Sequence, residues 1–159
     1  MRLSPIDRLT ILPDPTWRRS HAGHTDLHFA AEHAELSALI LLVDRDADTR
    51  AILRAAFEHR GYEVLDASDG AVGLRLASEQ RPDVIVGDFP LDVPGHSPFT
   101  AAARTLGRPE ARILAFTPRA LPGELMAARA VCDEVVTKPA SPLKVVEVVE
   151  RLLGGGTSR

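Results

Sequence analysis

The sequence predicts an α/β fold in which helices cover both faces of a parallel β-sheet. Short apolar runs alternate with helix-like stretches five times between about residues 38 and 153, and this alternation is typical of parallel sheets with right-handed crossovers. The run Val84-Ile85-Val86 is apolar and β-branched, as in a strand buried on both faces. It leads to Asp88, and ligands of open parallel sheets bind just beyond the carboxyl ends of the strands. Asp88 is therefore a candidate for chemistry, although an isolated aspartate more often caps a loop or a helix.

Composition excludes several classes of protein. The chain has 159 residues, enough for one domain with an appendage. Its net charge of −3 argues against general nucleic-acid binding, because domains that bind nucleic acid usually carry a basic excess. No apolar run approaches the ~20 residues of a membrane span. Cys132 is the only cysteine and no signal peptide is visible, so we expect a protein of the reducing cytoplasm that binds neither nucleic acid nor membrane.

The first residues differ in composition from the rest of the chain. Residues 1–37 contain three prolines, the only tryptophan and four of the six histidines. We expect them to form a partly disordered N-terminal extension, in which only residues 25–37 have a helical pattern. We assign residues 38–153 to a single domain, and residues 154–159, which begin with three glycines, to a flexible tail.

The histidines of the extension allow two interpretations. His21, His24 and His28 could share one helical face, with His33 a turn further on, and imidazoles one turn apart can chelate a metal. The alternative is a solvated polar face. Since no cysteine or firm third ligand accompanies these histidines, the solvated face is the favoured interpretation.

The expected strands are short apolar runs, most of which lead to a polar residue. Leu39 to Val43 is a continuous apolar run that ends at Asp44. Residues 111–116 lead to Thr117, and residues 134–137 lead to Lys138. The remaining strands are residues 62–67 and the run that ends at Asp88.

The expected helices carry start and stop signals. Asp46 or Asp48 caps the first helix, and Gly61 ends it. Ser141 caps the valine-rich last helix, with Pro142 at its first position. The other helices are expected from Asp69-Gly70 onward, over residues 100–106 and from Pro122 to about residue 130, and residues 89–98 form a proline- and glycine-rich loop.

Polar side chains at four strand ends form the candidate site. Because the carboxyl ends of parallel strands lie at one edge of a sheet, Asp44, Asp88, Thr117 and Lys138 should converge there. The set suits phosphoryl transfer onto a carboxylate. Asp88 would be the nucleophile, and Asp44 would help to hold a divalent cation. Thr117 would hydrogen-bond a phosphoryl oxygen, and Lys138 would pair with the resulting charge.

These residues stand in stretches that resemble the receiver domain of bacterial response regulators, the CheY-like family. The resemblance covers about residues 38–153 and rests on five pieces in the family's order and spacing. The pieces are Leu39-Ile-Leu-Leu-Val-Asp44 with Asp48-Thr49-Arg50, Gly61-Tyr-Glu-Val with Asp69-Gly70, Arg81-Pro-Asp-Val-Ile-Val-Gly-Asp88, Ala115-Phe-Thr117 and Thr137-Lys138-Pro139. The resemblance implies a flavodoxin-like (βα)5 three-layer sandwich with strand order 2-1-3-4-5.

The resemblance also implies a role in two-component signalling. Receivers take a phosphoryl group from a sensor histidine kinase or a phosphotransfer protein, with Mg²⁺. By match, Asp88 is the phosphoacceptor, Thr117 the switch hydroxyl and Lys138 the paired lysine. The chain is not expected to be an enzyme, so its signal would leave through a downstream protein partner or a homodimer. The expected surface is the face built by the helix that Pro122 opens, the strand of residues 134–137 and the last helix.

Three departures from the family pattern concern the pocket. Arg45 replaces the second of two adjacent acids, the one that usually ligates Mg²⁺ directly. The loop after Asp88 departs from the family's proline position, although the carbonyl of Pro90 could still ligate the metal and Asp92 adds a carboxylate. Val135 stands at the position of the aromatic switch residue. A rotating aromatic ring therefore cannot report phosphorylation in this chain.

Because of Arg45, the sequence allows two alternative functions. With Arg45 and Lys138 opposing Asp44 and Asp88, the formal charge of the pocket is zero, so Mg²⁺ binding is expected to be possible but weakened. The guanidinium could also bridge the two aspartates and hold the site closed. The chain is then either a single-domain receiver, which accepts phosphate on Asp88 or signals by protein contact, or a phosphorylation-independent pseudo-receiver that acts as a binding module.

Two other classes of protein fit less well. A phosphatase of the haloacid dehalogenase type also uses aspartate, threonine, lysine and Mg²⁺. However, the spacing of Asp88 and Asp92 is wrong for it, and we expect no room for a cap domain. Dinucleotide binding is disfavoured because no Gly-x-Gly-x-x-Gly follows residues 39–43.

Overall fold

The computed structural model describes residues 37–89, 99–118 and 121–154 of the chain. The predicted N-terminal extension with its histidines, residues 90–98 of the predicted loop and the predicted tail after Gly154 lie outside the described residues. The domain boundaries therefore stay predictions.

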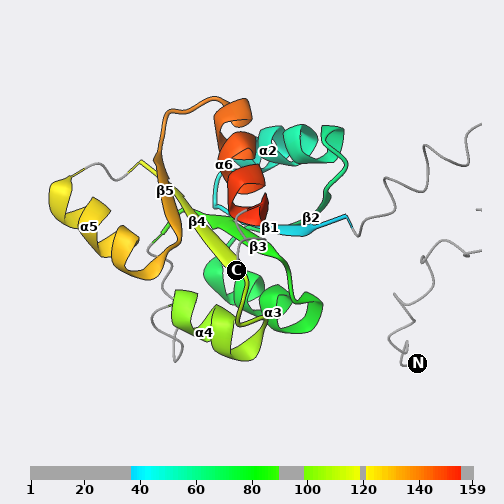
Figure 1. Cartoon of the computed structure of the whole chain (residues 1–159), viewed down its shortest axis with the longest axis horizontal. Helices are drawn as coiled ribbons and strands as arrows, with labels where there is room; N and C mark the ends of the chain where they lie inside the picture. The colour runs from blue at the N-terminus through cyan, green and yellow to red at the C-terminus, as the bar shows by residue number, and fades with distance from the viewer. Residues whose placement is uncertain (1–36, 90–98, 119–120, 155–159) are drawn as a thin grey trace, which may run out of the picture. The chain divides into compact units, whose positions relative to one another are not determined.

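Five parallel strands form one sheet in the order β2-β1-β3-β4-β5, which confirms the predicted fold (Figure 1). The strands are β1 (Leu39–Val43), β2 (Glu63–Ala67), β3 (Val84–Gly87), β4 (Arg112–Thr117) and β5 (Glu134–Thr137). The helices are α2 (Ala47–His59), α3 (Gly70–Gln80), α4 (Phe99–Leu106), α5 (Pro122–Val131) and α6 (Pro142–Gly154). Strands and helices thus alternate in the expected order, with small shifts at their ends.

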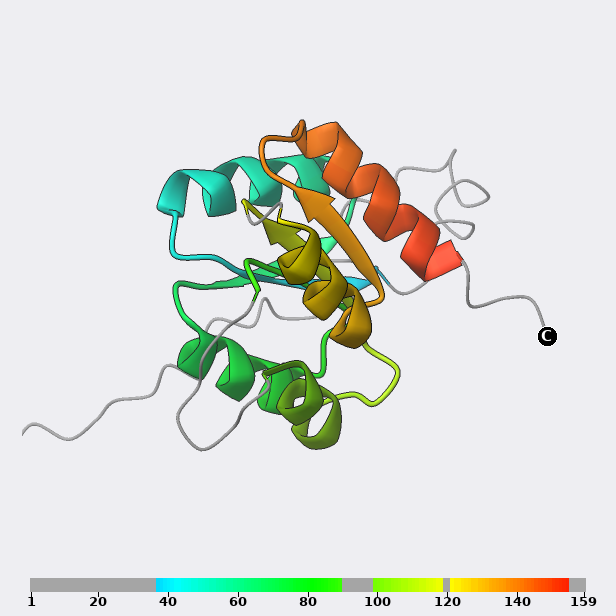
Figure 2. The same cartoon turned by 90° about the vertical axis from the view of Figure 1, so that its left-hand side faces the viewer.

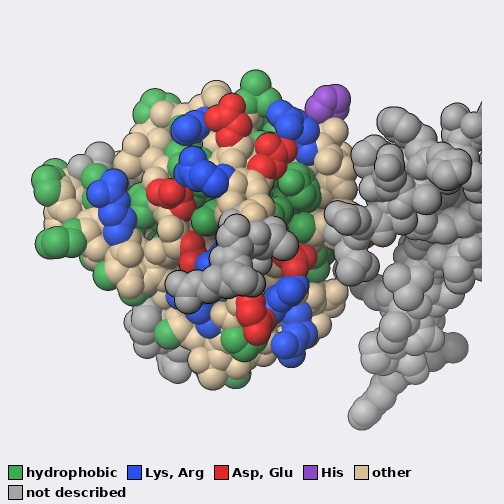
Figure 3. Space-filling model, in the orientation of Figure 1, with side chains coloured by type: hydrophobic (Ala, Val, Ile, Leu, Met, Phe, Trp, Pro, Cys, Tyr) green, Lys and Arg blue, Asp and Glu red, His purple; other side chains and the backbone are tan. Residues whose placement is uncertain are grey.

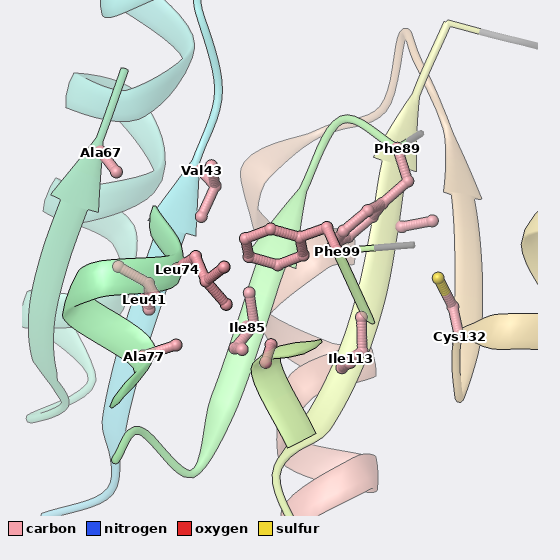
Figure 4. Packing of buried hydrophobic residues seen from close by; sticks show 12 residues of the cluster. Leu41, Val43, Ala67, Leu74, Ala77, Ile85, Phe89, Phe99, Ile113 and Cys132 are labelled. Atoms are coloured by element: carbon pink, nitrogen blue, oxygen red, sulfur yellow. The ribbon is translucent and has the colours of Figure 1, made fainter. Parts of the chain in front are cut away.

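The helices lie in two layers, one on each face of the sheet (Figures 1 and 2). On one face, α2 and α6 pack on a cluster that includes Leu42, Val86 and Phe116. On the other face, α3, α4 and α5 contribute to a second cluster around Leu41 and Ile85, which Figure 4 shows from close by. Alternate residues of β1 and β3 therefore serve opposite clusters, as expected for strands buried on both faces. None of the helices described here has the length and apolar character needed to cross a membrane.

The first two helices begin where the sequence signals indicated, and each begins with an aspartate cap. Asp46 caps α2 by accepting hydrogen bonds from the main-chain N–H groups of Asp48 and Thr49. Asp69 caps α3 in the same way, with a carboxylate oxygen 2.9 Å from a main-chain nitrogen of the first turn. Gly61 follows α2 with φ of 85°, a backbone conformation that favours glycine. These caps fix where the loops at the carboxyl edge of the sheet turn into helices.

Two aspartates fix the opposite, amino-terminal edge of the sheet. Oδ2 of Asp83 accepts a hydrogen bond from the main-chain N–H of Leu39 at 2.8 Å, and its other oxygen pairs with Arg108. Oδ2 of Asp133 accepts a hydrogen bond from the main-chain N–H of Ile113 at 2.7 Å, and Asp133 also pairs with an arginine of α4. These carboxylates hold the starts of β1 and β4, far along the strands from the candidate site.

Candidate functional site

The register of β1 and β3 brings Asp44 and Asp88 side by side. Val43 pairs with Gly87 in parallel register, so the two aspartates follow at neighbouring positions. The main-chain N–H of Asp88 donates a hydrogen bond to the carbonyl oxygen of Val43 at 3.2 Å. The two carboxylates therefore start from adjacent points of the same sheet edge.

Asp44 is almost buried, and both of its carboxylate oxygens have hydrogen-bond partners. Its exposed fraction is 7%. Oδ1 accepts a hydrogen bond from the main-chain N–H of Asp46 at 2.9 Å, and Oδ2 lies 2.5 Å from the ammonium nitrogen of Lys138. Such charge-assisted contacts are among the stronger hydrogen bonds in proteins. Within the described part of the chain, Lys138 thus forms its ion pair with Asp44 and not with Asp88.

Lys138 is held at this edge from two sides. Its main-chain N–H donates to the carbonyl oxygen of Thr117 at 2.8 Å. Its ammonium lies 5.0 Å from the centroid of the Phe116 ring, within cation–π range. Thr117 itself is 1% exposed. The ends of β4 and β5 therefore place a buried threonine and a lysine at the edge that carries the two aspartates.

Asp88 is fixed by the residues on either side of it. A Cβ at Gly87 would lie 3.1 Å from the carbonyl oxygen of Val43, so the backbones pass close to each other there. Phe89 is buried, and its ring centroid lies 5.6 Å from that of Phe99 (Figure 4). The Asp88 carboxylate is half-buried and forms no hydrogen bond or ion pair with the residues described here.

Arg45 is exposed, and its side chain does not form the suggested bridge between Asp44 and Asp88. Its charge acts instead on Asp69. The pKa of the Asp69 carboxyl is lowered, chiefly by the hydrogen bond from the main-chain N–H of Val72 and to a smaller extent by the positive charge of Arg45. Because Arg45 is exposed, water can solvate its guanidinium without desolvation cost.

Comparison with known proteins assigns this arrangement to a family. Residues 40–150 match the family model described as the response regulator receiver domain. The chain belongs to this family. Receiver domains are signalling modules of two-component systems, and they generally bind Mg²⁺ in the active-site cleft.

Relatives of this receiver include longer regulators. The transcriptional regulatory protein PrrA of Mycobacterium bovis is 31% identical over 117 residues, which cover 74% of this chain and 50% of PrrA. The transcriptional regulatory protein KdpE of Mycobacterium tuberculosis is 33% identical over 102 residues, which cover 64% of this chain and 44% of KdpE. The receiver chain spans about half the length of the curated relatives it matches.

Solved structures include isolated receivers. The chemotaxis protein CheY4 of Vibrio cholerae is 28% identical with a TM-score of 0.63, covering 72% of this chain and 98% of CheY4. The receiver domain of the sensor histidine kinase PA1611 of Pseudomonas aeruginosa is 26% identical with a TM-score of 0.64, covering 74% of this chain and 98% of that domain. That structure holds a magnesium ion coordinated in the active-site cleft.

Arg50, for which the sequence indicated no role, contacts the receiver loop that carries Asp44. Its Nη1 donates to the carbonyl oxygens of Asp44 at 2.6 Å and of Arg45 at 3.2 Å. Its Nε donates to Asp66 of β2 at 3.2 Å. The available signal was the spacing of Arg50 and Arg54, because residues four apart share one face of a helix and can reach a common acid.

The described residues of this receiver supply an incomplete set of ligands for Mg²⁺. Residues 37–89, 99–118 and 121–154 contain no group of three acidic, histidine or cysteine side chains that could hold a metal. Asp44 is already paired with Lys138 at 2.5 Å, and Arg45, which the resemblance puts at the position of the family's second acid, is exposed. Because Mg²⁺ requires oxygen ligands in near-octahedral geometry, Asp44 and Asp88 would need further oxygen ligands beside them. Pro90 and Asp92, the other suggested ligands, lie outside the described residues.

Proposed function

We propose that this receiver domain accepts a phosphoryl group on Asp88 from a sensor histidine kinase or a phosphotransfer protein in the cytoplasm, and transmits the signal by protein contact. The main support is the half-buried Asp88 carboxylate at the end of β3, next to the Asp44–Lys138 pair. Among the described residues no cation occupies this carboxylate. A carboxylate oxygen is a recognised nucleophile for phosphoryl groups, and we assign that role to Asp88.

In the proposed step, an oxygen of Asp88 attacks the phosphorus of a phosphohistidine. A P–O bond forms while the P–N bond breaks, and the imidazole leaves with the bonding electron pair and takes up a proton. The product is an acyl phosphate on Asp88, which water later hydrolyses to inorganic phosphate. Lys138 would pair with one phosphoryl oxygen and Thr117 would hydrogen-bond another. Lys138 would then leave the Asp44 carboxylate and form an ion pair with the phosphoryl group.

We further propose that Mg²⁺ binds to this receiver weakly. Asp44 and Asp88 supply two negative charges, while Arg45 and Lys138 supply two positive charges. Even from its exposed position, the Arg45 guanidinium offsets part of the attraction that the two carboxylates would offer a divalent cation. This reduced attraction follows from Arg45, because an acid at that position would make the pocket negative.

Labelling with a small-molecule phosphoryl donor tests the phosphoacceptor. We expect acetyl phosphate to add one phosphoryl group slowly to the natural chain, as followed by intact-protein mass spectrometry, and to add none to Asp88→Asn. Glu79→Gln, at a surface acid of α3 that pairs with Arg75, is the matched control and should be labelled as the natural chain is. Labelling that persists in Asp88→Asn, or its complete absence with both acetyl phosphate and a phosphorylated kinase, would reject Asp88 as the acceptor.

The second candidate function is a phosphorylation-independent binding module. The Lys138–Asp44 contact at 2.5 Å favours it, because the lysine has a partner without any phosphoryl group. In this case Asp88→Asn would leave partner binding unchanged, as measured by pull-down from extracts of the source cells. Loss of binding in that variant would favour the phosphorylated receiver instead.

The output surface that we propose is the face formed by α5, β5 and α6. Leu121, Met126 and Leu143 are 68%, 72% and 60% exposed, and Figure 3 shows apolar side chains at the surface over α5, at the left. None of the residues of α5 is buried. The valines of α6, which made this helix a candidate, lie in the core instead; they are Val145, Val146, Val148 and Val149. A partner or a second copy would therefore bind mainly to α5.

A further inference from the structure

Arg50 joins the loop between β1 and α2 to the neighbouring strand β2. Its Nη1 lies 2.6 Å from the carbonyl oxygen of Asp44 and 3.2 Å from that of Arg45. Its Nε lies 3.2 Å from a carboxylate oxygen of Asp66. The Arg50 side chain is 17% exposed, so these contacts are largely shielded from water. One guanidinium thus ties two successive peptide groups of the loop to β2.

Asp66 is itself held in place by a second arginine. Its other oxygen forms an ion pair with Arg54, and Arg54 also donates to the carbonyl oxygen of Val64 at 2.8 Å. Because the donors of a guanidinium are fixed in a planar fork, these paired contacts restrict the Asp66 carboxylate. The position of Arg50 therefore depends on Asp66.

The peptide groups that Arg50 holds belong to residues of the pocket. The Asp44 carboxylate reaches Lys138 at 2.5 Å and the main-chain N–H of Asp46 at 2.9 Å, and both contacts depend on the course of this loop. Arg45 is the next residue, and its side chain is exposed. A shift of the loop would move Asp44 and Arg45 together, because they share the peptide group that Arg50 binds.

We propose that Arg50 is a positioning residue of this receiver. By fixing the carbonyl groups of Asp44 and Arg45, it holds the Asp44 carboxylate beside Asp88 and keeps the Arg45 guanidinium outside the pocket. Asp66 sets the position of Arg50 in turn. The effect on phosphorylation rests on the proposed function of Asp88, whereas the effect on the loop does not.

Hydrogen exchange of the Asp46 amide tests the effect on the loop, because this amide reports the position of the Asp44 carboxylate directly. We expect Arg50→Gln to raise its exchange rate about tenfold or more. Arg75→Gln is the matched control, since Arg75 pairs with Glu79 at 3.2 Å on the exposed face of α3, and it should leave the Asp46 amide unchanged. An unchanged amide in a folded Arg50→Gln protein would overturn the proposal.

Asp66→Asn provides a second variant, which also serves if Arg50→Gln does not fold. We expect it to raise the exchange rate of the Asp46 amide in the same direction. Because Asp66 acts through Arg50, the double variant should exchange no faster than Arg50→Gln alone. An Asp46 amide that is unchanged in Asp66→Asn, or effects that add in full, would overturn the dependence of Arg50 on Asp66.

Labelling of Asp88 by acetyl phosphate tests the effect on the pocket. We expect labelling about tenfold slower in Arg50→Gln than in Arg75→Gln. Arg50→Lys should be intermediate, because one ammonium cannot reproduce the forked contacts. Faster exchange of the Asp46 amide with unchanged labelling would overturn the positioning role. If neither the natural chain nor Arg75→Gln is labelled, the proposed function of Asp88 fails, and the Asp46 amide alone still decides whether Arg50 holds the loop.

Discussion

The ammonium of Lys138 lies 2.5 Å from Oδ2 of Asp44, a side chain that is 9% exposed. A carboxylate this deeply buried needs a partner, since an unpaired buried charge is costly. The lysine that the family resemblance pairs with the phosphoryl group thus already neutralises an acid of the pocket. In the proposed reaction, a phosphoryl group on Asp88 would compete with Asp44 for Lys138, the residue that follows β5.

Removing the Lys138 ammonium should destabilise the receiver because the buried Asp44 carboxylate would lose its ion-pair partner. We expect Lys138→Met to lower the free energy of unfolding by about 1 to 3 kcal/mol, because it leaves the Asp44 carboxylate without its cation. Asp44→Asn in the same chain should restore most of the loss. Urea unfolding at neutral pH measures both effects. A double variant as unstable as Lys138→Met would show that the loss comes from packing of the lysine stem and not from the charge.

Replacing Arg45 by aspartate should create a better metal site. We expect Arg45→Asp to raise the affinity for Mg²⁺ about tenfold or more, because the change removes a repulsive charge and adds an oxygen ligand. A Mg²⁺ titration followed by the amide signals of Gly87 and Asp88 measures it. Arg45→Gln, which removes the charge without adding a ligand, should be intermediate. Tight Mg²⁺ binding by the natural chain would contradict the inhibitory role of Arg45.

Gly107 should be intolerant of a side chain. A Cβ there would lie 2.6 Å from the carbonyl oxygen of Ala77 and 2.7 Å from that of Ala103, so α3 and α4 would have to separate. We expect Gly107→Ala to lower the free energy of unfolding by about 1 to 3 kcal/mol. Gly123→Ala is the matched control, because nothing lies within 4 Å of the added Cβ. Equal stability of the two variants in urea would contradict the close approach.

Two helix caps should contribute to the loss of stability in acid. Hydrogen bonds from main-chain N–H groups, chiefly that of Thr49 for Asp46 and that of Val72 for Asp69, lower both carboxyl pKa values from 3.8. Because the folded pKa lies below the unfolded one, the stabilisation is present above the unfolded pKa and is lost as the pH falls through the folded pKa.

A variant whose capping residue cannot be protonated should therefore lose less stability in acid. We expect Asp69→Asn to be less stable than the natural chain at pH 7 and to lose less of its stability between pH 7 and about pH 3. Urea unfolding at the two pH values measures the difference. Glu79→Gln controls for the loss of one surface charge. An acid loss in Asp69→Asn as steep as that of the natural chain would contradict the role of the cap.

The exposed apolar residues of α5 should matter for association and not for folding. We expect Met126→Glu, at a side chain that is 72% exposed, to leave the free energy of unfolding unchanged and to weaken binding of a partner or a second copy. Native mass measurements and pull-downs test it. Leu106→Glu, at an exposed position of α4, is the control. If both variants bind as the natural chain does, α5 is not the contact surface.

The fold was predictable because its signals are local. Each strand is a short apolar run, and the caps at Asp46 and Asp69 are visible as single residues before helical patterns. The meeting of Asp44 and Asp88 follows from the rule that parallel strands end at one edge. These features need only the order of the elements and not the detailed positions of side chains.

The contacts within the site were less predictable because each long side chain could reach more than one partner. Lys138 could have met either aspartate, and the sequence does not say which. Arg45 is a long side chain, and the sequence alone does not show that it is exposed instead of bridging Asp44 and Asp88. The contacts of Arg50 join α2 to β2, so they appear only once these two elements are packed together.

The starts of β1 and β4 are held by Asp83 and Asp133, which bind main-chain N–H groups at 2.8 and 2.7 Å. The carboxylates that secure the sheet thus stand at the other edge from those around Asp88. Because of this separation, residues at the carboxyl edge can be changed without altering the contacts at the amino-terminal edge. A substitution at Arg45 would therefore leave the contacts of Asp83 and Asp133 with the starts of the strands in place.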